Sequence, residues 1–339
     1  MDKRVIFAVA GSGKTTYIVN NLFPEKRSLI ITYTKNNYSN IESKVLKKFN
    51  GTWPQNILLM TYFQFLFRFC YKPFLADKFK GKGIVFKSNP NKWEKQSSLK
   101  YYFTENRYFY SNRLAFFLEN QNIINDIKKR LEKYFDEFII DEVQDIAGRD
   151  FNFLEKLMDA EINMLFVGDF FQHTFDTSRD GNVNKSLFNN KLSYEERFQK
   201  RGFFCDSTTL VKSWRCSYEV CDFITNNLGI TIFSNHDKND NNCIALITDE
   251  WKIKEILEND NIIKLHYQDS NKYGNFHKNW GDSKGEDDYQ DVCVMLNKKT
   301  MSKFKSGKLY ELPSATLNKL YVAITRAHRN CYFIEEYGI

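Results

Sequence analysis

The sequence has few glycines and prolines, 15 and 5 among 339 residues, and its seven cysteines include no Cys-x-x-Cys pair. No histidine stands at the spacing of zinc ligands either, so we expect no structural metal and a reducing, intracellular compartment, most simply the cytoplasm. No apolar stretch approaches the roughly 20 residues that cross a bilayer, so we expect no membrane partner. The first motif begins at Ala8, so we expect no signal peptide.

The composition is that of a folded, basic protein. Hydrophobic residues make up 42% and aromatic residues 16% of the chain, which is ample for sizeable cores. A chain of 339 residues is long enough for two domains, and two is the expected number. The formal net charge of +7 suits an anionic partner such as a nucleic acid, although charge alone identifies none.

Short apolar runs alternate with helix-like segments along most of the chain. Apolar runs at 28–33, 57–60 and 163–167 predict buried strands. The apolar positions of 38–49 recur at the spacing of one helix face. Strands that alternate with helices indicate parallel pairing and right-handed crossovers, so the predicted fold class is α/β with parallel sheets. The polar stretch 177–203 predicts an irregular bridge to a second half with the same alternation.

A glycine-containing loop directly follows the first apolar run. Its residues are Ala8, Val9, Ala10, Gly11, Ser12, Gly13, Lys14, Thr15 and Thr16. The two glycines let backbone N–H groups close around phosphate oxygens. Lys14 would neutralise the β- and γ-phosphates, and the Thr15 hydroxyl would bind Mg²⁺. We therefore predict a nucleotide site, against the alternative of a glycine-rich turn with a surface lysine.

Two acids follow a later apolar run, 138–140. Asp141 and Glu142 stand where a buried parallel strand is expected to end. An acid at that edge, beside a phosphate-binding loop, can hold Mg²⁺ directly or through water. A second acid can aim the attacking water. We therefore predict Asp141 as a metal ligand and Glu142 as the general base, although an isolated Asp-Glu pair is usually only a solvated surface feature.

Residues 71–113 differ in composition from the rest of the chain. Lysines and arginines outnumber acids there, and aromatic side chains are interleaved with them. Basic charge follows a phosphate backbone, and aromatic faces stack on bases. The segment is predicted to be an insertion, with two interpretations open: a surface that binds single strands, or a small subdomain with a solvated basic face.

Taken together, these motifs resemble those of the superfamily 1 DNA helicases of the UvrD/Rep/PcrA type. The loop matches that family's Ala-x-x-Gly-x-Gly-Lys-Thr form, which accounts for Ala8, and Asp141–Asp145 matches its Asp-Glu-x-Gln-Asp motif. Further segments resemble other motifs of that family and follow one another in the same order as in the family. The last of these segments is a close match. They are Thr32–Thr34, Thr61–Phe65, Val167–Gln172, Ser213–Arg215, Ser283–Gly285 and Leu320–Ala327.

The resemblance implies roles for residues outside the loop. Gln172 would sense the γ-phosphate, and Arg215 and Arg326 would be arginine fingers that stabilise transition-state charge. An arginine in the second half must reach a phosphate held by the first, so ATP is expected in a cleft between two RecA-like lobes, 1–200 and 201–339. Contacts to single-stranded DNA are expected from Thr32, Tyr33, Thr61, Tyr62, Phe65, Trp280 and Lys284.

The chain also departs from this family. No glutamine precedes Ala8, so adenine selectivity is open and other nucleoside triphosphates are candidate substrates. Phe175 fits one aromatic position, but Thr177 stands where the family places a base-stacking ring. The acid of the Lys-Gly-Leu-Glu motif falls within Glu286–Asp288, of which Asp288 aligns best and is predicted to contact the nucleotide. Apart from the basic segment, the family's large insertions are missing.

The resemblance implies an ATP-dependent DNA helicase or single-stranded DNA translocase, a DNA-dependent ATPase with ATP and Mg²⁺ as cofactors and 3′→5′ polarity. Its expected partners are single-stranded DNA or a tailed duplex. A second interpretation is an ATP-switched nucleic-acid-binding subunit of a replication, repair or defence complex that does not unwind processively. A third, a small-molecule P-loop kinase, would need neither the second-half arginines nor the Asp-Glu-x-Gln-Asp motif.

Overall fold

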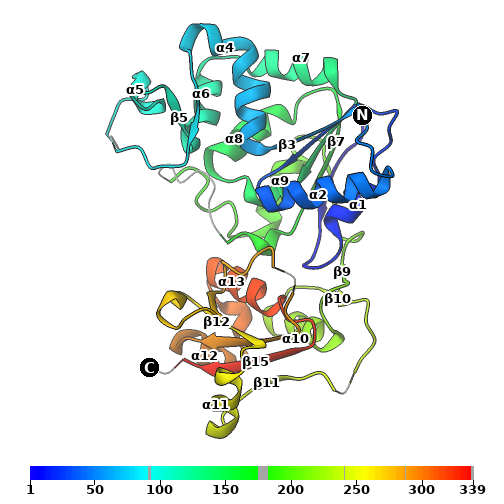
Figure 1. Cartoon of the computed structure of the whole chain (residues 1–339), viewed down its shortest axis with the longest axis vertical. Coiled ribbons are helices and arrows are strands. Elements are labelled where there is room, and N and C mark those ends of the chain that lie inside the picture. Colours follow the sequence, from blue (N-terminus) through cyan, green and yellow to red (C-terminus); the bar gives the residue numbers. More distant parts are fainter. Residues whose placement is uncertain (91–92, 175–181, 240, 287, 337–339) are drawn as a thin grey trace. The chain divides into compact units, whose positions relative to one another are not determined.

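The computed structural model describes residues 1–90, 93–174, 182–239, 241–286 and 288–336 (Figure 1). The chain divides into two compact units, both of the α/β class with parallel sheets, which confirms the predicted fold class. The first unit comprises 1–6, 15–168 and 176–206, and the second comprises 7–14, 169–175 and 207–339. Segments 7–14 and 169–175, expected in the first lobe, thus belong to the second unit.

The first unit is built on a six-stranded sheet. Its order is β3-β2-β6-β7-β1-β8, and the strands are β1 (Lys3–Phe7), β2 (Ser28–Thr32), β3 (Ile57–Thr61), β6 (Glu137–Asp141), β7 (Asn163–Gly168) and β8 (Phe204–Asp206). Every residue of β2 is buried, as expected of a parallel strand covered on both faces. The register places Thr32 level with Thr61 and Asp141 level with Val167. The predicted site residues therefore stand at the carboxyl ends of neighbouring strands.

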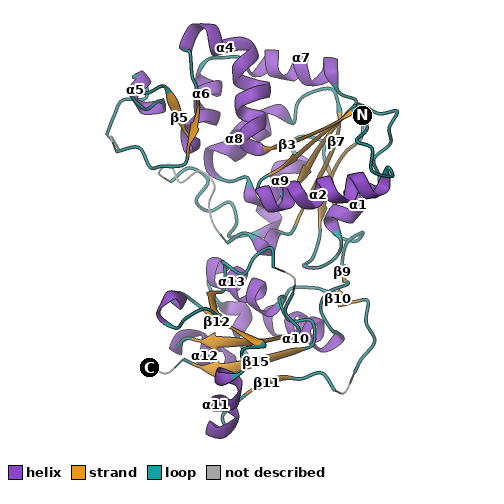
Figure 2. Ribbon diagram, viewed as in Figure 1, coloured by secondary structure: helices purple, strands orange, loops and turns teal. Residues whose placement is uncertain are grey.

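Helices connect these strands (Figure 2). They include α1 (Lys14–Asn20), α2 (Lys35–Lys48), α7 (Ile124–Tyr134), α8 (Gly148–Leu157) and α9 (Lys191–Gln199), with the short 3₁₀ turn η3 (Val143–Asp145). Helix α9 lies inside the stretch 177–203, so the prediction of an irregular bridge was wrong there. Tyr194 and Phe198, four positions apart on α9, are both buried against Phe151 of α8. This tertiary packing stabilises a helix whose other residues are mostly polar.

The basic segment forms a small subdomain of the first unit. After α3 (Tyr62–Gln64) and a π-helix, η1 (Phe65–Tyr71), come α4 (Lys72–Phe79), β4 (Gly83–Val85), α5 (Leu99–Tyr102), β5 (Tyr108–Tyr110), η2 (Ser111–Arg113) and α6 (Leu114–Asn120). Phe109 is fully buried, with ring centroids 4.8 Å from Tyr71 and 5.2 Å from Phe117. Many of the interleaved aromatic residues therefore form a core, whereas Phe86 and Trp93 are exposed.

The second unit contains a five-stranded parallel sheet. Its order is β11-β15-β14-β12-β13, with β11 (Ile244–Leu246), β12 (Ile262–His266), β13 (His277–Asn279), β14 (Asp291–Leu296) and β15 (Asn330–Glu335). A separate parallel pair joins β9 (Lys212–Ser213) to β10 (Phe233–Ser234). The helices are α10 (Tyr218–Leu228), α11 (Glu250–Glu258), α12 (Lys298–Lys305) and α13 (Ser314–Ile324), with 3₁₀ turns η4 (Phe170–Gln172), η5 (Ser270–Lys272) and η6 (Leu309–Glu311).

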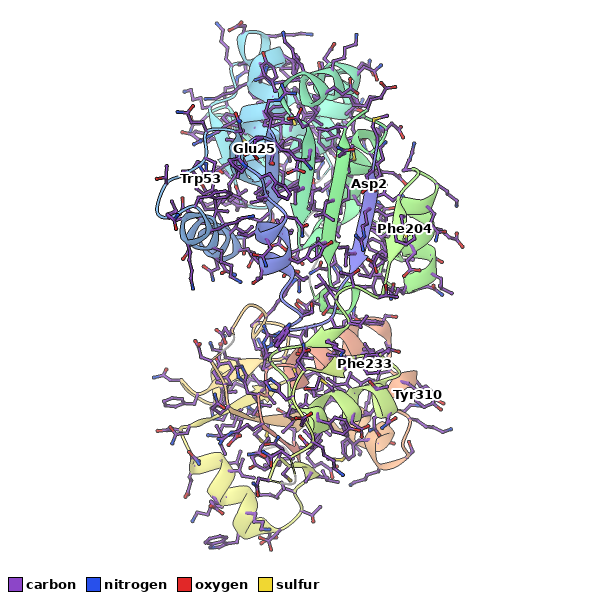
Figure 3. All side chains as sticks on the ribbon, turned by 90° about the vertical axis from the view of Figure 1, so that its right-hand side faces the viewer. Asp2, Glu25, Trp53, Phe204, Phe233 and Tyr310 are labelled. Atoms are coloured by element: carbon purple, nitrogen blue, oxygen red, sulfur yellow. The ribbon has the colours of Figure 1, made fainter. Side chains whose placement is uncertain are left out.

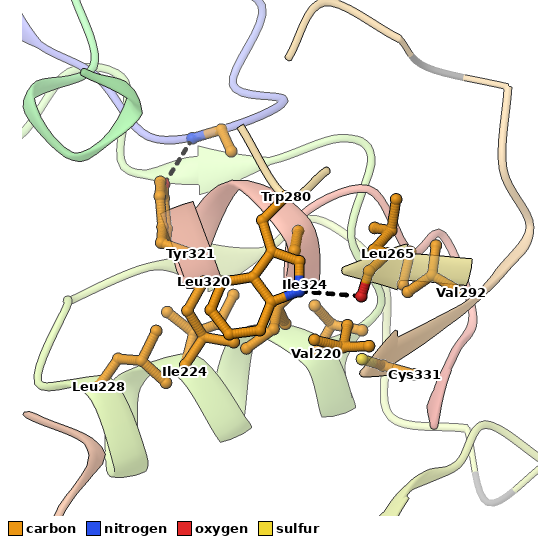
Figure 4. Close-up of a cluster of buried hydrophobic side chains, with 14 of the residues drawn as sticks. Val220, Ile224, Leu228, Leu265, Trp280, Val292, Leu320, Tyr321, Ile324 and Cys331 are labelled. Atoms are coloured by element: carbon orange, nitrogen blue, oxygen red, sulfur yellow. Dashed lines mark hydrogen bonds between the residues drawn. The ribbon is translucent and has the colours of Figure 1, made fainter. Parts of the chain in front are cut away.

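The core of the second unit surrounds Trp280 (Figure 4). The indole ring is fully buried, and its Nε1 donates a hydrogen bond to the Leu265 carbonyl oxygen over 2.9 Å. Val9 and Ala10 of the glycine-containing loop belong to the same cluster. These two loop residues therefore pack within the second unit, to which they belong.

Single apolar side chains project from both units. Examples are Phe204 on the edge strand β8 and Phe233 on β10 (Figure 3). Isolated exposed side chains of this kind are common on folded proteins. Within the described ranges, no helix combines the length and hydropathy needed to cross a bilayer.

Candidate nucleotide and nucleic-acid sites

The loop between β1 and α1 has the backbone of a phosphate cradle. Gly11 and Gly13 adopt left-handed φ angles of 68° and 83°, which residues with a Cβ rarely adopt. The side chains of Ser12 and Lys14 are buried. The Ser12 hydroxyl has no hydrogen-bond partner within the described part of the chain. A buried polar atom in this state is well suited to a polar ligand such as a phosphate.

The hydroxyl of Thr15 meets the carboxylate of Asp141. Thr15 Oγ1 donates to Asp141 Oδ2 over 3.3 Å, and Asp141 is buried at the end of β6. Mg²⁺ is usually bound by one or two protein oxygens together with phosphate oxygens and water, so this pair fits the ion. No group of three or more His, Cys, Asp or Glu side chains that could hold a metal by itself occurs among the described residues. Bound Mg²⁺ would therefore share its coordination with a nucleotide.

Glu142 has an unusual backbone and a well-defined partner. Its φ of 58° and ψ of 50° lie in the left-handed region, which non-glycine residues adopt uncommonly. Its Oε2 accepts a hydrogen bond from Gln144 Nε2 over 2.5 Å. A Cβ at Gly168 would lie 2.3 Å from Gln144 Oε1, so only glycine leaves room for this amide. Gly168 and Gln144 together orient the Glu142 carboxylate.

A buried hydrogen-bond chain crosses the second unit. The backbone N–H of Ala10 donates to the Tyr321 hydroxyl over 2.9 Å, and that hydroxyl donates to Asp169 Oδ2 over 3.0 Å. Burial and the neighbouring Asp169 carboxylate raise the pKa of Tyr321 well above its usual value. Asp169 Oδ1 also accepts from the Phe171 N–H, at the start of the turn that carries the buried Gln172. The loop is thereby connected to two other predicted motifs.

The two predicted arginine fingers have different surroundings within the second unit. A Cβ on Gly11 would lie 2.6 Å from Arg215 Cβ, so Arg215 packs directly on the loop, where it is half-buried. Arg326 is fully buried, and its guanidinium donates to the carbonyl oxygens of Glu286 over 2.8 Å and Val322 over 3.2 Å. Arg215 is therefore the more accessible of the two cations.

Most of the residues that were predicted to contact nucleic acid are buried or hydrogen-bonded within the fold. The rings of Tyr62, Phe65 and Trp280 are buried, so base stacking on these three does not fit the structure. Thr32 is buried in β2, and Thr61 caps α3 by accepting from the Gln64 N–H over 3.3 Å. Three of the predicted contacts, Tyr33, Thr61 and Lys284, are partly exposed.

An aromatic group that the sequence did not single out lies beside Tyr33. The ring centroid of Phe63 is 5.6 Å from that of Tyr33 and 4.9 Å from that of Phe86. Phe86 is 71% exposed. We call Tyr33, Phe63 and Phe86 the aromatic strip. The available signals were weak: Phe63 lies inside a predicted DNA motif, and Phe86 lies in the basic segment.

The remaining predicted residues are only partly described. Phe175, Thr177 and Asp287 lie outside the described residues. Asp288 is exposed, whereas the Glu286 carboxylate accepts hydrogen bonds from Lys278 and from the Tyr289 hydroxyl. Of the two acids that are described, Asp288 is therefore the more accessible to a ligand.

No protein-family model and no curated protein sequence matches the chain. It is similar to two solved structures of Arterivirus nonstructural protein 10 (helicase), one of them described as a complex with DNA. Each has a TM-score of 0.51 and 13% sequence identity, and each match covers 99% of this chain. The chain spans 61% and 60% of the length of those two chains. These likenesses show a helicase-like fold, without showing the UvrD/Rep/PcrA type in particular.

Proposed function

We propose that the chain is an ATP-hydrolysing motor of the superfamily 1 helicase type that moves along single-stranded DNA. The contact between Thr15 and Asp141 carries this proposal, because it places a hydroxyl and a carboxylate together beside the phosphate-binding loop. The helicase-like fold and the DNA in one similar structure support the choice of substrate. The UvrD/Rep/PcrA type and 3′→5′ polarity rest on the order of the sequence motifs.

In the proposed mechanism the loop N–H groups and Lys14 hold the β- and γ-phosphates. Thr15 and Asp141 would hold Mg²⁺, which neutralises charge on the phosphate oxygens when bound. Glu142, oriented by Gln144, would accept the proton of the attacking water.

Positive charge for the transition state is proposed to come first from Arg215. Its side chain packs on Gly11 of the loop, and guanidinium groups stabilise the spreading charge of the transferred phosphoryl group. Arg326 would have to exchange its bond to the Glu286 carbonyl oxygen before it could reach a phosphate. We therefore assign Arg326 a role that begins only when nucleotide is bound.

The Ala10–Tyr321–Asp169 chain is the proposed route from nucleotide state to Gln172. A phosphate bound by the loop would compete for loop N–H groups, and Ala10 donates one of them to Tyr321. Asp169 in turn bonds to Tyr321 and caps the turn of Gln172. For the nucleic acid, the aromatic strip is the proposed base-stacking surface, since aromatic faces accept any base.

The second candidate function is an ATP-switched nucleic-acid-binding subunit that does not unwind DNA processively. It is favoured by the buried state of Arg326, whose guanidinium is already bonded to two carbonyl oxygens. It is also favoured by the burial of Tyr62, Phe65 and Trp280, three of the rings expected to stack on bases. Such a subunit would bind ATP and DNA with slow hydrolysis.

The test is nucleoside-triphosphate hydrolysis by the purified chain, with and without single-stranded DNA, across a salt series. The motor predicts strong stimulation by DNA that falls as salt weakens phosphate contacts. Lys14→Ala should abolish hydrolysis, and Lys47→Ala, an exposed lysine on α2, should not. Nucleotide binding without stimulated hydrolysis would favour the switch, and absence of nucleotide binding would overturn both functions.

A further inference from the structure

A cavity of about 410 Å³ opens in the first unit, and neither Thr15 nor Asp141 lines it. It lies near the amino-terminal ends of β2, β3 and β6. Its lining includes Arg27, Arg68, Arg130, Leu58, Tyr134 and Phe135. None of the residues assigned to the phosphate-binding loop or to the aromatic strip lines it. Its volume falls within the usual range for small-molecule sites.

Three arginines line this cavity, and only one is neutralised. Arg27 forms an ion pair with Asp136, with Nη2 and Oδ1 2.6 Å apart. Within the described part of the chain, Arg68 and Arg130 take part in no ion pair, and the buried Nε of Arg130 has no hydrogen-bond partner. The cavity therefore carries two uncompensated positive charges.

The guanidinium of Arg130 is held in place by aromatic rings. It lies 4.9 Å from the ring centroid of Phe69 and 4.9 Å from that of Tyr134. Cation–π contacts with two rings restrict the side chain without using its N–H donors. A pre-oriented planar guanidinium is the group that best matches the oxygens of a phosphate.

We propose that this cavity binds a phosphate monoester of the size of a nucleoside 5′-monophosphate. A phosphate monoester carries between about −1.5 and −2 charges at pH 7, which matches Arg68 and Arg130 together. A carboxylate would leave one of the two unmatched. The apolar side chains of Leu58 and Phe135 and the ring of Tyr134 would receive the nucleoside. The phosphate could belong to a free nucleotide or to the 5′ end of a strand.

Isothermal titration calorimetry of the full chain with thymidine 5′-monophosphate tests the proposal. Lys14→Ala protein in Mg²⁺-free buffer removes the predicted loop site, so the result does not depend on the proposed function. We expect one site, which Arg68→Gln and Arg130→Gln each weaken at least about tenfold, the scale of a charge-assisted hydrogen bond. Lys129→Gln, an exposed charge change on the same helix as Arg130, should leave the affinity unchanged.

Two further titrations identify the source of the phosphate. Oligothymidylate with a 5′-phosphate that binds at least about tenfold more tightly than the same strand without that phosphate would assign the site to strand ends. Equal or weaker binding would assign it to free nucleotides, and thymidine without phosphate should not bind. Because Arg68 is exposed and unpaired, its replacement does not threaten folding even if Arg130→Gln does. Absence of mononucleotide and 5′-phosphate binding, or binding that Arg68→Gln leaves unchanged, would overturn the proposal.

Discussion

The hydroxyl of Tyr321 donates a hydrogen bond to Asp169 Oδ2 over 3.0 Å, and both side chains are buried. The two residues are 152 positions apart in the sequence. The same hydroxyl accepts the N–H of Ala10 from the phosphate-binding loop. A buried carboxylate depends on such donors, because loss of one leaves charge in a medium that solvates it poorly. This phenol therefore connects the loop to Asp169.

Tyr321→Phe should destabilise the chain by about 1–3 kcal/mol, the usual range when a buried partner is removed. The substitution keeps the ring and takes away one donor to Asp169 and one acceptor for Ala10. Urea unfolding followed by circular dichroism measures the effect. Tyr310→Phe, on a ring that is 53% exposed, is the matched control. Equal stability of both variants would show that the bond contributes nothing.

Gly168→Ala should slow hydrolysis because the new methyl group would lie 2.3 Å from Gln144 Oε1 and 2.9 Å from Val143 Cγ1. Gln144 would have to move, and Glu142 would lose the amide that orients it. If Glu142 is the base, we expect a fall in kcat of about tenfold or more. Gly281→Ala, whose methyl group would have no neighbour nearer than 3.4 Å, should leave kcat close to wild type. An unchanged kcat in Gly168→Ala would separate Gln144 from catalysis.

The parts of the fold that sequence reasoning predicted are those encoded by contiguous residues. The buried strand β2, the loop after β1 and the acids at the end of β6 each depend on a short apolar run, which glycine or carboxylate follows in the last two cases. Such runs specify local structure directly. The contact between Thr15 and Asp141 follows from them, because parallel strands present their carboxyl ends at one edge.

What the sequence did not reveal depends on tertiary packing. Tyr62 and Phe63 are adjacent aromatic residues of one motif, yet the first is buried and the second contacts Phe86 of the basic segment. Residue type alone cannot distinguish a core ring from a stacking ring, because both are apolar and flat. Trp280, predicted to contact nucleic acid, is likewise fully buried. Helix α9 was missed because its stability comes from burial of Tyr194 and Phe198 in an otherwise polar stretch.

The ion pair between Glu155 and Arg197 should make stability depend on pH. Arg197 donates from Nε and Nη2 to the two carboxylate oxygens over 2.7 and 2.8 Å, which lowers the pKa of Glu155 below its usual value. The unfolded chain therefore takes up a proton at higher pH than the folded one. The stabilisation is complete above the unfolded pKa and is lost as pH falls through the folded pKa.

Glu155→Gln should accordingly reduce the free energy of unfolding by about 1 kcal/mol at pH 7. The difference from wild type should shrink progressively below about pH 4.5, where the unfolded carboxylate of the wild type takes up its proton. Urea unfolding across a pH series measures it. Glu196→Gln removes a carboxylate from an exposed pair with Lys200 at 3.8 Å and should have no measurable effect. A difference that stays constant with pH would show that the charge of Glu155 is not its cause.

Phe86→Ala should weaken binding of single-stranded DNA without affecting nucleotide hydrolysis in the absence of DNA. Phe86 is the most exposed ring of the aromatic strip and contacts Phe63, so a base stacked on it would continue a surface that begins at Tyr33. Loss of one stacking ring costs about 1–3 kcal/mol per base, or roughly 5- to 150-fold in affinity. Fluorescence anisotropy with labelled oligothymidylate measures this change. Trp251→Ala, on a ring that is 73% exposed on α11, should bind like wild type. Equal affinities of the wild type, Phe86→Ala and Trp251→Ala would show that the nucleic-acid surface lies elsewhere.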